Sequence, residues 1–185
     1  MAPSDRRARE KAERHDRIVT AARTLAETQG WSSVTTRRLA DEIDYTPPVL
    51  YQHFPDGRHG VIAAVALAGF ADFVAVGSAA MAGADDALVV VVDTYMSFAR
   101  DHPATYEAMF SLSVPVEFAA ESTPGVLRAA FDLIVDAIGR DHDDAAVRAE
   151  ILWSALHGVC ELERHHRLDP ALADARRALL IAQAR

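Results

Sequence analysis

Two adjacent prolines, Pro47 and Pro48, constrain the fold more than any other feature of the sequence. Proline has no backbone N–H and clashes with the preceding helical turn, so no regular helix runs through this point. The first turn of a helix needs no acceptors for its N–H groups, and prolines fit there. The pattern therefore predicts a short helix that begins at Pro47, is capped by the hydroxyl of Thr46, and ends near His53.

The rest of the sequence is typical of an all-α protein with about nine helices. Apolar residues recur every three or four positions, and no alternating strand pattern or hairpin signal is present. Gly77–Gly83 and residues 113–124 suggest linkers, and Asp141–Asp144 suggests a cap. The expected helices span about 16–28, 35–43, 47–54, 58–77, 85–101, 103–112, 125–139, 144–166 and from 170 onward.

The short helices at 35–43 and 47–54 are joined by Asp44-Tyr45, which is the spacing of a helix-turn-helix. In that motif the second helix enters the major groove of DNA, while hydroxyls and guanidiniums at the first helix hold phosphate. A packed helical hairpin that binds no nucleic acid is the alternative. The residues predicted to contact DNA are Thr35, Thr36, Arg37, Thr46, Pro47, Pro48, Val49, Tyr51, Gln52 and His53.

Charge is unevenly distributed along the chain. The net charge is −8, yet residues 1–60 carry a net +1 and residues 61–185 a net −9. An anionic partner is therefore expected at the first third. The charged N-terminus lacks a signal-peptide core, and the apolar run Val61–Ala71 is too short for a bilayer, so a cytoplasmic protein without a membrane partner is expected. The single Cys160 allows no internal disulfide and is expected to be a small buried residue.

Residues 17–65 resemble the DNA-binding domain of the TetR family of transcriptional repressors. The matching elements are Ile18, Ala21-Ala22, Gly30, Thr35-Thr36, Leu39-Ala40 and the run Leu50-Tyr51-Gln52-His53-Phe54. More loosely, Trp153-Ser154-Ala155-Leu156-His157-Gly158 is similar to a helix of one TetR subgroup. The resemblance implies a repressor, not an enzyme, that binds palindromic double-stranded operator DNA as a homodimer and is released by a small, mostly apolar effector.

The sequence departs from the family pattern at four positions. Asp44 and Pro48 replace small residues, Gly57 replaces a lysine that contacts phosphate, and Gly60 replaces a leucine. Asp44 tolerates a left-handed turn but adds a negative charge near DNA. Arg58 or His59 is the expected substitute for the missing lysine, with the N-terminal arginines as further compensation, so affinity should depend steeply on salt.

The resemblance also implies a DNA-binding domain at 1–60 with a basic N-terminal arm, and a ligand-binding and dimerisation domain at 61–185. Aromatic and sulfur side chains suit an apolar ligand, although the same residues suit a filled core. The expected ligand contacts are Phe70, Phe73, Tyr95, Phe98, Tyr106, Met109, Phe110, Phe131, Trp153 and His157. Small and apolar positions on the last two long helices suit a two-fold interface or, alternatively, the core of one chain. The expected interface residues are Ile151, Ala155, Gly158, Val159, Leu162, Leu172, Ala175 and Leu179.

Three other functions are compatible with parts of the pattern. His157, Glu161 and His165 share one helical face with metal-ligand spacing, but a solvated face or a dimer contact is the commoner explanation of such a pattern. Ser154 and His157 lie one turn apart, but the strand-turn-helix elbow of a hydrolase is missing, so no catalytic site is expected. No metal and no cofactor are expected either. A TetR-like regulator without a small effector remains the main alternative, and a small helical enzyme or metal-binding module is the more distant one.

Overall fold

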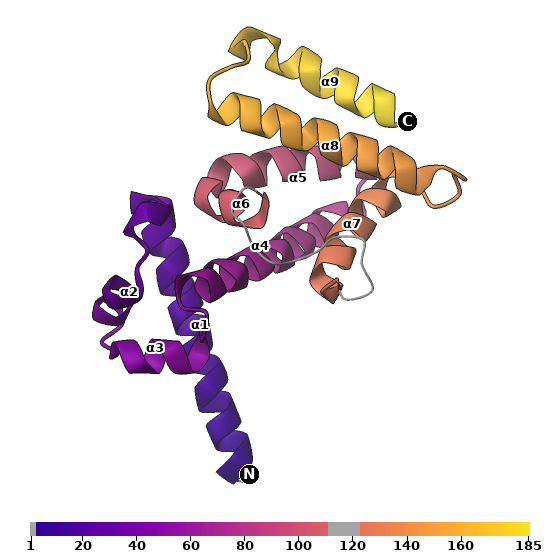
Figure 1. The fold of residues 1–185 in the computed structure, drawn as a ribbon. Coiled ribbons are helices and arrows are strands. Elements are labelled where there is room, and N and C mark those ends of the chain that lie inside the picture. Colours follow the sequence, from indigo (N-terminus) through magenta and orange to yellow (C-terminus); the bar gives the residue numbers. More distant parts are fainter. Residues whose placement is uncertain (1–2, 111–122) are drawn as a thin grey trace. The chain divides into compact units, whose positions relative to one another are not determined.

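The computed structural model describes residues 3–110 and 123–185, and the described residues are helical without any strand (Figure 1). This confirms the predicted all-α fold with nine α-helices over that part of the chain. Two short 3-10 helices are also present, η1 between α1 and α2 and η2 between α8 and α9. The elements are α1 (Pro3–Gln29), η1 (Trp31–Ser33), α2 (Thr36–Glu42), α3 (Pro47–His53), α4 (Arg58–Met81), α5 (Ala87–Asp101), α6 (Pro103–Phe110), α7 (Gly125–Ile138), α8 (Ala145–Arg164), η2 (Pro170–Leu172) and α9 (Ala173–Ala184).

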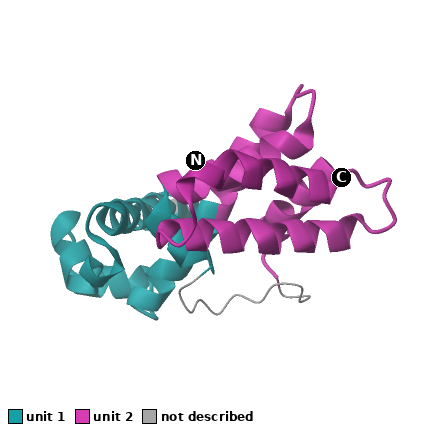
Figure 2. Cartoon of the chain, turned by 90° about the horizontal axis from the view of Figure 1, so that it is seen from above, with its two compact units in different colours: residues 1–69, 102–116 teal, residues 70–101, 117–185 magenta. Residues whose placement is uncertain are grey.

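The described residues form two compact units (Figure 2). One comprises the chain up to residue 69 together with 102–110, and the other comprises 70–101 with 123–185. Helix α6 thus belongs to the same unit as the predicted DNA-binding helices, since it packs on α1. The division of function at residues 60 and 61 remains a prediction.

A stripe of apolar side chains on α1 forms the core of the first unit. Ile18, Ala22 and Leu25 are buried there, as are Leu39 of α2 and Leu50 of α3. Burial of these side chains packs the two short helices against α1. Helices of this length are not stable by propensity alone, so this packing stabilises them.

Helix α1 begins at Pro3, well before the predicted start near residue 16. Residues 4–17 carry no apolar periodicity, so the pattern that marks a buried helix face does not reach them. Their alanine, arginine, lysine and glutamate residues nevertheless favour helix, and the existing turns of α1 remove the cost of nucleation.

Helix α6 is attached to α1 through the side chain of Glu27. Its carboxylate accepts hydrogen bonds from the backbone N–H groups of Ala104 and Thr105, both at 2.9 Å, and from the Thr105 hydroxyl at 2.7 Å. The indole Nε1 of Trp31 donates to the carbonyl of Ala104 at 2.8 Å. A residue from another helix therefore supplies the N-terminal cap of α6.

In the second unit, α5, α7, α8 and α9 pack together. Charged side chains attach α9 to its neighbours: Arg177 pairs with Asp93 of α5, with Nη2 to Oδ2 at 2.6 Å, and Arg176 pairs with Glu163 of α8 at 3.1 Å. Helix α9 follows η2, which begins at Pro170, so the prediction of a helix opening at that proline was right only for a 3-10 turn.

Helix α4 continues through Gly77 to Met81, so the linker predicted at Gly77–Gly83 was wrong over most of its length. A β-carbon at Gly77 would lie 2.4 Å from Cδ2 of Leu133 on α7. Glycine at this position permits close packing of two helices rather than ending one of them. The helix ends at Met81, and Gly83, two residues later, has a φ of 79°.

Because it continues this far, α4 is also longer than the predicted run at Val61–Ala71. By length and composition it is, among the described residues, the one helix that meets the requirements for crossing a bilayer. Core helices of proteins outside membranes meet the same requirements, and Val61, Val65 and Phe73 of α4 are buried within the protein. We therefore interpret α4 as a core helix.

Helix α8 starts after Asp144, but the Asp144 side chain makes no capping hydrogen bond, contrary to the prediction. Its carboxylate instead accepts a hydrogen bond from Nε of Arg148 at 2.8 Å. The predicted end of the sixth helix at 112 and most of the predicted connection at 113–124 lie outside the described residues.

Candidate functional site

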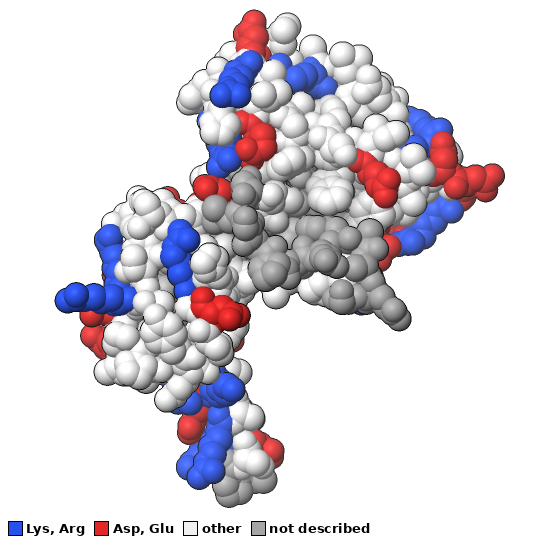
Figure 3. All heavy atoms as spheres, in the orientation of Figure 1, with Lys and Arg blue, Asp and Glu red and all other residues white. Residues whose placement is uncertain are grey.

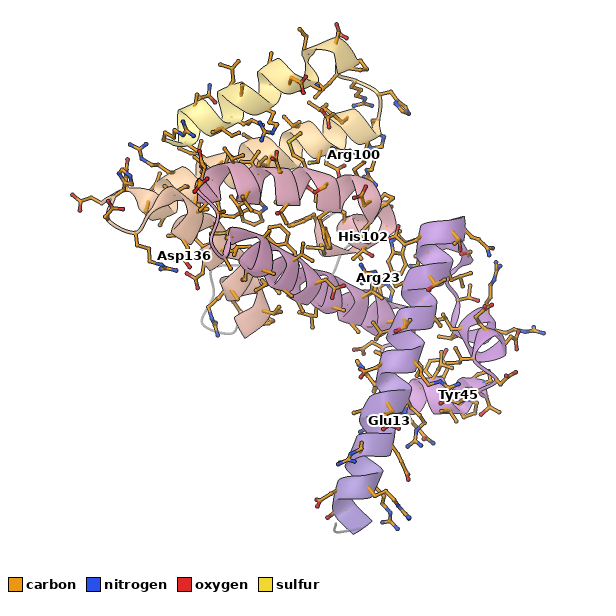
Figure 4. All side chains as sticks on the ribbon, turned by 180° about the vertical axis from the view of Figure 1, so that it is seen from behind. Glu13, Arg23, Tyr45, Arg100, His102 and Asp136 are labelled. Carbon is orange, nitrogen blue, oxygen red and sulfur yellow. The ribbon has the colours of Figure 1, made fainter. Side chains whose placement is uncertain are left out.

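Helices α2 and α3 form a helix-turn-helix with the predicted link. Asp44 adopts a left-handed conformation with a φ of 55°, and the backbone N–H of Tyr45 donates to the carbonyl of Ala40 at 2.9 Å. Aspartate tolerates this conformation better than most residues do, which explains how the turn forms without glycine. Figure 4 labels Tyr45 at this link.

Helix α3 begins at Pro47 and ends at His53, as predicted, and Thr46 has the extended backbone of a cap. The Thr46 hydroxyl, however, makes no capping hydrogen bond, so that part of the prediction was wrong. Pro47 and Pro48 remove the first two N–H donors, and the third, from Val49, donates to the Thr46 carbonyl at 2.9 Å. The first turn therefore has no free N–H group left to donate to the Thr46 hydroxyl, and Thr46 is exposed.

The start of α2 presents the polar groups predicted for phosphate. Thr35 caps the helix, as expected, and its hydroxyl accepts from the N–H of Arg38 at 3.2 Å. Thr36 is half-buried, and Arg37 is exposed and forms no ion pair within the described residues. A free guanidinium beside the first N–H groups of a helix suits an anion.

One side of α3 is exposed, while Leu50 on the other side is 1% exposed. Tyr51 is 49% exposed, Gln52 is also exposed, and Val49 is half-buried. Together with Pro47 and Pro48, these residues give α3 a mixed apolar and hydrogen-bonding surface, which can contact thymine methyl groups and adenine edges.

The backbone conformation at Gly57 explains why glycine, and not the lysine of the family pattern, stands at this position. Its φ is 57°, which strains any residue with a side chain, and a β-carbon there would lie 3.3 Å from Cε1 of Tyr51. The same β-carbon would lie 3.7 Å from Cγ2 of Thr36. The Tyr51 ring thus lies against the turn before α4 and close to α2, which fixes its position on the surface.

Arg58 uses two of its nitrogen atoms inside the protein. Nε donates to the carbonyl of Val34 at 3.0 Å and Nη2 to the carbonyl of Trp31 at 2.9 Å. This geometry favours a role in holding the start of α4 on η1 rather than the phosphate contact predicted for Arg58.

His53 lies at the end of α3, half-buried, with its Nδ1 atom making no hydrogen bond within the described part of the chain. Burial lowers the pKa of His53 below its usual range, and the positive charges of Arg14, His15 and Lys11 lower it further. His53 is therefore held in its neutral form at neutral pH.

Sequence reasoning missed the contact between Arg17 and Tyr45. The guanidinium donates to the Tyr45 hydroxyl at 3.0 Å and lies 5.1 Å from the ring centroid. The two residues are far apart in sequence, and only the packing of α1 against the link brings them together. A groove of about 470 Å³ opens beside this pair, lined by polar α1 residues such as Thr20 and Thr24 and by Ile43.

The predicted ligand residues divide between the two units. In the second unit, Phe73 makes edge contacts with Tyr95 and Phe98 at centroid distances of 5.7 and 5.9 Å, and Phe131 lies 6.4 Å from Trp153. Phe70 is buried in the same unit. The α6 residues Tyr106, Met109 and Phe110 belong to the first unit, where the Tyr106 and Phe110 rings lie 4.8 Å apart.

His157 is half-buried on α8, and burial lowers its pKa, while the nearby Glu161 carboxylate opposes that effect. Glu161 pairs with Arg164 at 2.8 Å and lies 3.9 Å from Nε2 of His165. Over residues 3–110 and 123–185, no group of three His, Cys, Asp or Glu side chains has an arrangement suited to a metal ion.

The predicted interface residues lie on α8, on α9 and, for Leu172, on η2. Ile151 is 64% exposed and Leu179 is 61% exposed, and exposed apolar side chains that gather on one surface mark interaction sites. A β-carbon at Gly158 would meet nothing within 4 Å, so this side of α8 is open in the single chain. The other predicted positions are half-buried or exposed: Ala155, Val159, Leu162, Leu172 and Ala175.

Comparison with known families gives two matches that together cover most of the chain. The family model for bacterial regulatory proteins of the tetR family matches residues 18–65, which include α2 and α3. The model for the tetracyclin repressor-like C-terminal domain matches residues 88–184.

Individual proteins agree with these matches. The chain is 32% identical, over 85% of its length and 73% of the relative, to the uncharacterized HTH-type transcriptional regulator Rv0681 of Mycobacterium tuberculosis. The fold of this chain resembles the crystal structure of SCO4313, with a TM-score of 0.74, 25% identity, and coverage of 95% and 98% of the two chains. It also resembles the TetR family regulator PfmR from Thermus thermophilus, with a TM-score of 0.60, 17% identity, and coverage of 89% and 97%.

Proposed function

The chain belongs to the TetR family of transcriptional regulators, and we propose that it is a repressor that binds palindromic operator DNA as a homodimer and is released by a small, mostly apolar ligand. The observation that carries this proposal is the exposed surface of α3 beside the polar start of α2. The protein then acts in the cytoplasm, where it reaches DNA.

In this proposal α3 is the helix that enters the major groove. Tyr51, Gln52 and Val49 face the base edges, with His53, Pro47, Pro48 and the free hydroxyl of Thr46 at the margins. Thr35, Thr36 and Arg37 contact phosphates, which position the helix without reading the sequence. Arg58 is assigned to holding α4 in place instead.

Dimerisation is supported by the exposed apolar side chains of α8, η2 and α9. Ile151, Leu162, Leu172 and Leu179 are between 39% and 64% exposed in the single chain. Two copies related by a two-fold axis would bury this surface in a four-helix interface. The substitution Leu179→Glu should then produce a monomer in sedimentation, whereas Val76→Glu, at an exposed apolar residue on α4, should leave the dimer intact.

A ligand site is supported by the aromatic cluster of the second unit. Phe73, Tyr95 and Phe98 form a buried aromatic cluster there, and the half-buried imidazole of His157 offers a polar group in the same unit. The same rings pack on one another as core residues do, and this observation favours a second candidate function, a TetR-like regulator without a small effector. A screen of apolar compounds against the protein–DNA complex separates the two.

The first experiment is a mobility shift of the purified protein on the DNA upstream of its own coding sequence, with scrambled DNA as the competitor. The proposal predicts a discrete complex that survives the competitor. Tyr51→Ala should weaken this complex at least tenfold and leave sedimentation of the protein unchanged, because Tyr51 is an exposed residue outside the core. Equal loss of DNA binding and of dimerisation would show that Tyr51 stabilises the fold rather than contacts DNA.

A further inference from the structure

The N-terminal part of α1 carries basic side chains along the same face that is apolar further on. Arg7, Lys11, Arg14 and Ile18 follow one another at spacings of four, three and four residues, which places them on one side of the helix. From Ile18 onward this side is buried in the core. We call Arg7, Lys11 and Arg14 the arm stripe, and it lies before residue 18, where the family match begins.

The charges of the arm stripe are not neutralised within the chain. Arg7, Lys11 and Arg14 form no ion pair with any residue in 3–110 or 123–185. Glu10, about one helical turn from both Arg7 and Arg14, pairs instead with Arg6 at 3.5 Å. Figure 3 shows lysine and arginine side chains on this part of α1, with acidic side chains beside them.

The other sides of this helical segment carry mixed charge. Asp5, Glu10, Glu13 and Asp16 accompany Arg6 and Arg9 there. Figure 4 labels Glu13 on this part of α1. The arm stripe, in contrast, is a row of basic side chains with no carboxylate among them.

The arm stripe also borders the C-terminal end of α3. The positive charges of Arg14 and Lys11 are close enough to lower the pKa of His53, and the ring of His15 lies 4.9 Å from that of Phe54. His53 follows directly after the exposed Tyr51 and Gln52. The stripe is therefore continuous with the surface that we assign to base reading.

We propose that the arm stripe binds the phosphate backbone of duplex DNA beside the base pairs read by α3. This inference rests on the proposed function and adds an interaction surface to it. Arg7 and Arg14 are about 10 Å apart along the helix axis. A duplex of that length carries about six phosphate charges, enough for every residue of the stripe. Such contacts carry no sequence information, so they strengthen binding to all duplexes alike.

The test compares two double variants of the full chain, Arg7→Gln/Lys11→Gln and Arg6→Gln/Arg9→Gln. Both remove two exposed positive charges from the same segment of α1, but only the first changes the arm stripe. Affinities for an operator duplex and for a scrambled duplex of equal length are measured at several salt concentrations, and thermal melting confirms that both variants are folded.

The stripe variant should bind both duplexes at least tenfold more weakly than the wild type at about 0.15 M salt. Its salt slope should fall by about 3 to 4 for a dimer, since each lost phosphate contact removes roughly 0.9. The control variant should remain within about threefold of the wild type. Equal losses of affinity in the two variants, or no loss in either, would contradict the proposal that the arm stripe binds phosphate, while leaving the proposed function intact. A wild-type protein that binds neither duplex would overturn both.

Discussion

Glutamine in place of Glu27 should destabilise the attachment of α6 to α1. The Glu27 carboxylate accepts three hydrogen bonds, two at 2.9 Å and one at 2.7 Å, from the first turn of α6. A glutamine amide offers one oxygen and turns its NH₂ group toward the remaining donors. It also removes the negative charge that favours a helix N-terminus.

The size of the effect follows from those bonds. Hydrogen bonds to a charged acceptor contribute about 1.5–3 kcal/mol each, roughly twice the contribution of neutral ones. Glu27→Gln loses at least one bond and the charge on the others, while half-burial of Glu27 reduces the total. We expect the free energy of unfolding to fall by about 2–4 kcal/mol.

Two assays measure this effect, and Glu13 provides the control. Urea unfolding gives the overall loss, and hydrogen exchange of the Ala104 and Thr105 amides reports the local one, because these are the donors that Glu27 accepts. Glu13→Gln removes the same charge from an exposed position of the same helix and should change stability by less than about 0.5 kcal/mol. A Glu27→Gln variant as stable as the control, with both amides still protected, would refute the reasoning.

Three further predictions concern other parts of the fold. Gly69→Ala should lower stability by about 1–2 kcal/mol in urea, because its β-carbon would lie 2.6 Å from the Thr105 methyl group, whereas Gly125→Ala, with open space around it, should change little. Burial raises the pKa of the Cys160 thiol to about 12, so a thiol reagent at about pH 8 should react slowly with the folded protein and rapidly in urea; fast reaction without urea would contradict this. The pKa of His53 is lowered in the folded state, so the unfolded chain binds the proton more readily and stability should fall as the pH drops through about 6.5. His53→Gln should lessen that fall between about pH 7.5 and 5.5, and an unchanged fall would assign it to other groups.

Features of the fold could be predicted from the sequence where local conformational preferences and tertiary packing agree. The start and end of α3, the cap at Thr35 and the left-handed turn at Asp44 all follow from residue types that tolerate few conformations. The buried stripe at Ile18 and Leu25 follows from helical periodicity.

Other features depend on contacts that no local pattern reveals. Gly77 suggested a linker, but it is a close contact between α4 and Leu133, and Arg58 proved to bind backbone carbonyls from η1 and the residue after it. The absence of a cap from the Thr46 hydroxyl, in contrast, was deducible, because two prolines leave only the N–H of Val49 in the first turn. The exposed part of α1 was not predicted because it carries no apolar periodicity.

A nuclease footprint on the DNA upstream of the chain's own coding sequence tests the central claim, recognition of operator DNA by α3 in a dimer, most directly. The account predicts two protected half-sites of inverted sequence, with centres about 34 Å or one helical turn apart, and loss of both in Tyr51→Ala. Uniform protection of any sequence, or protection that Tyr51→Ala leaves unchanged, would contradict it.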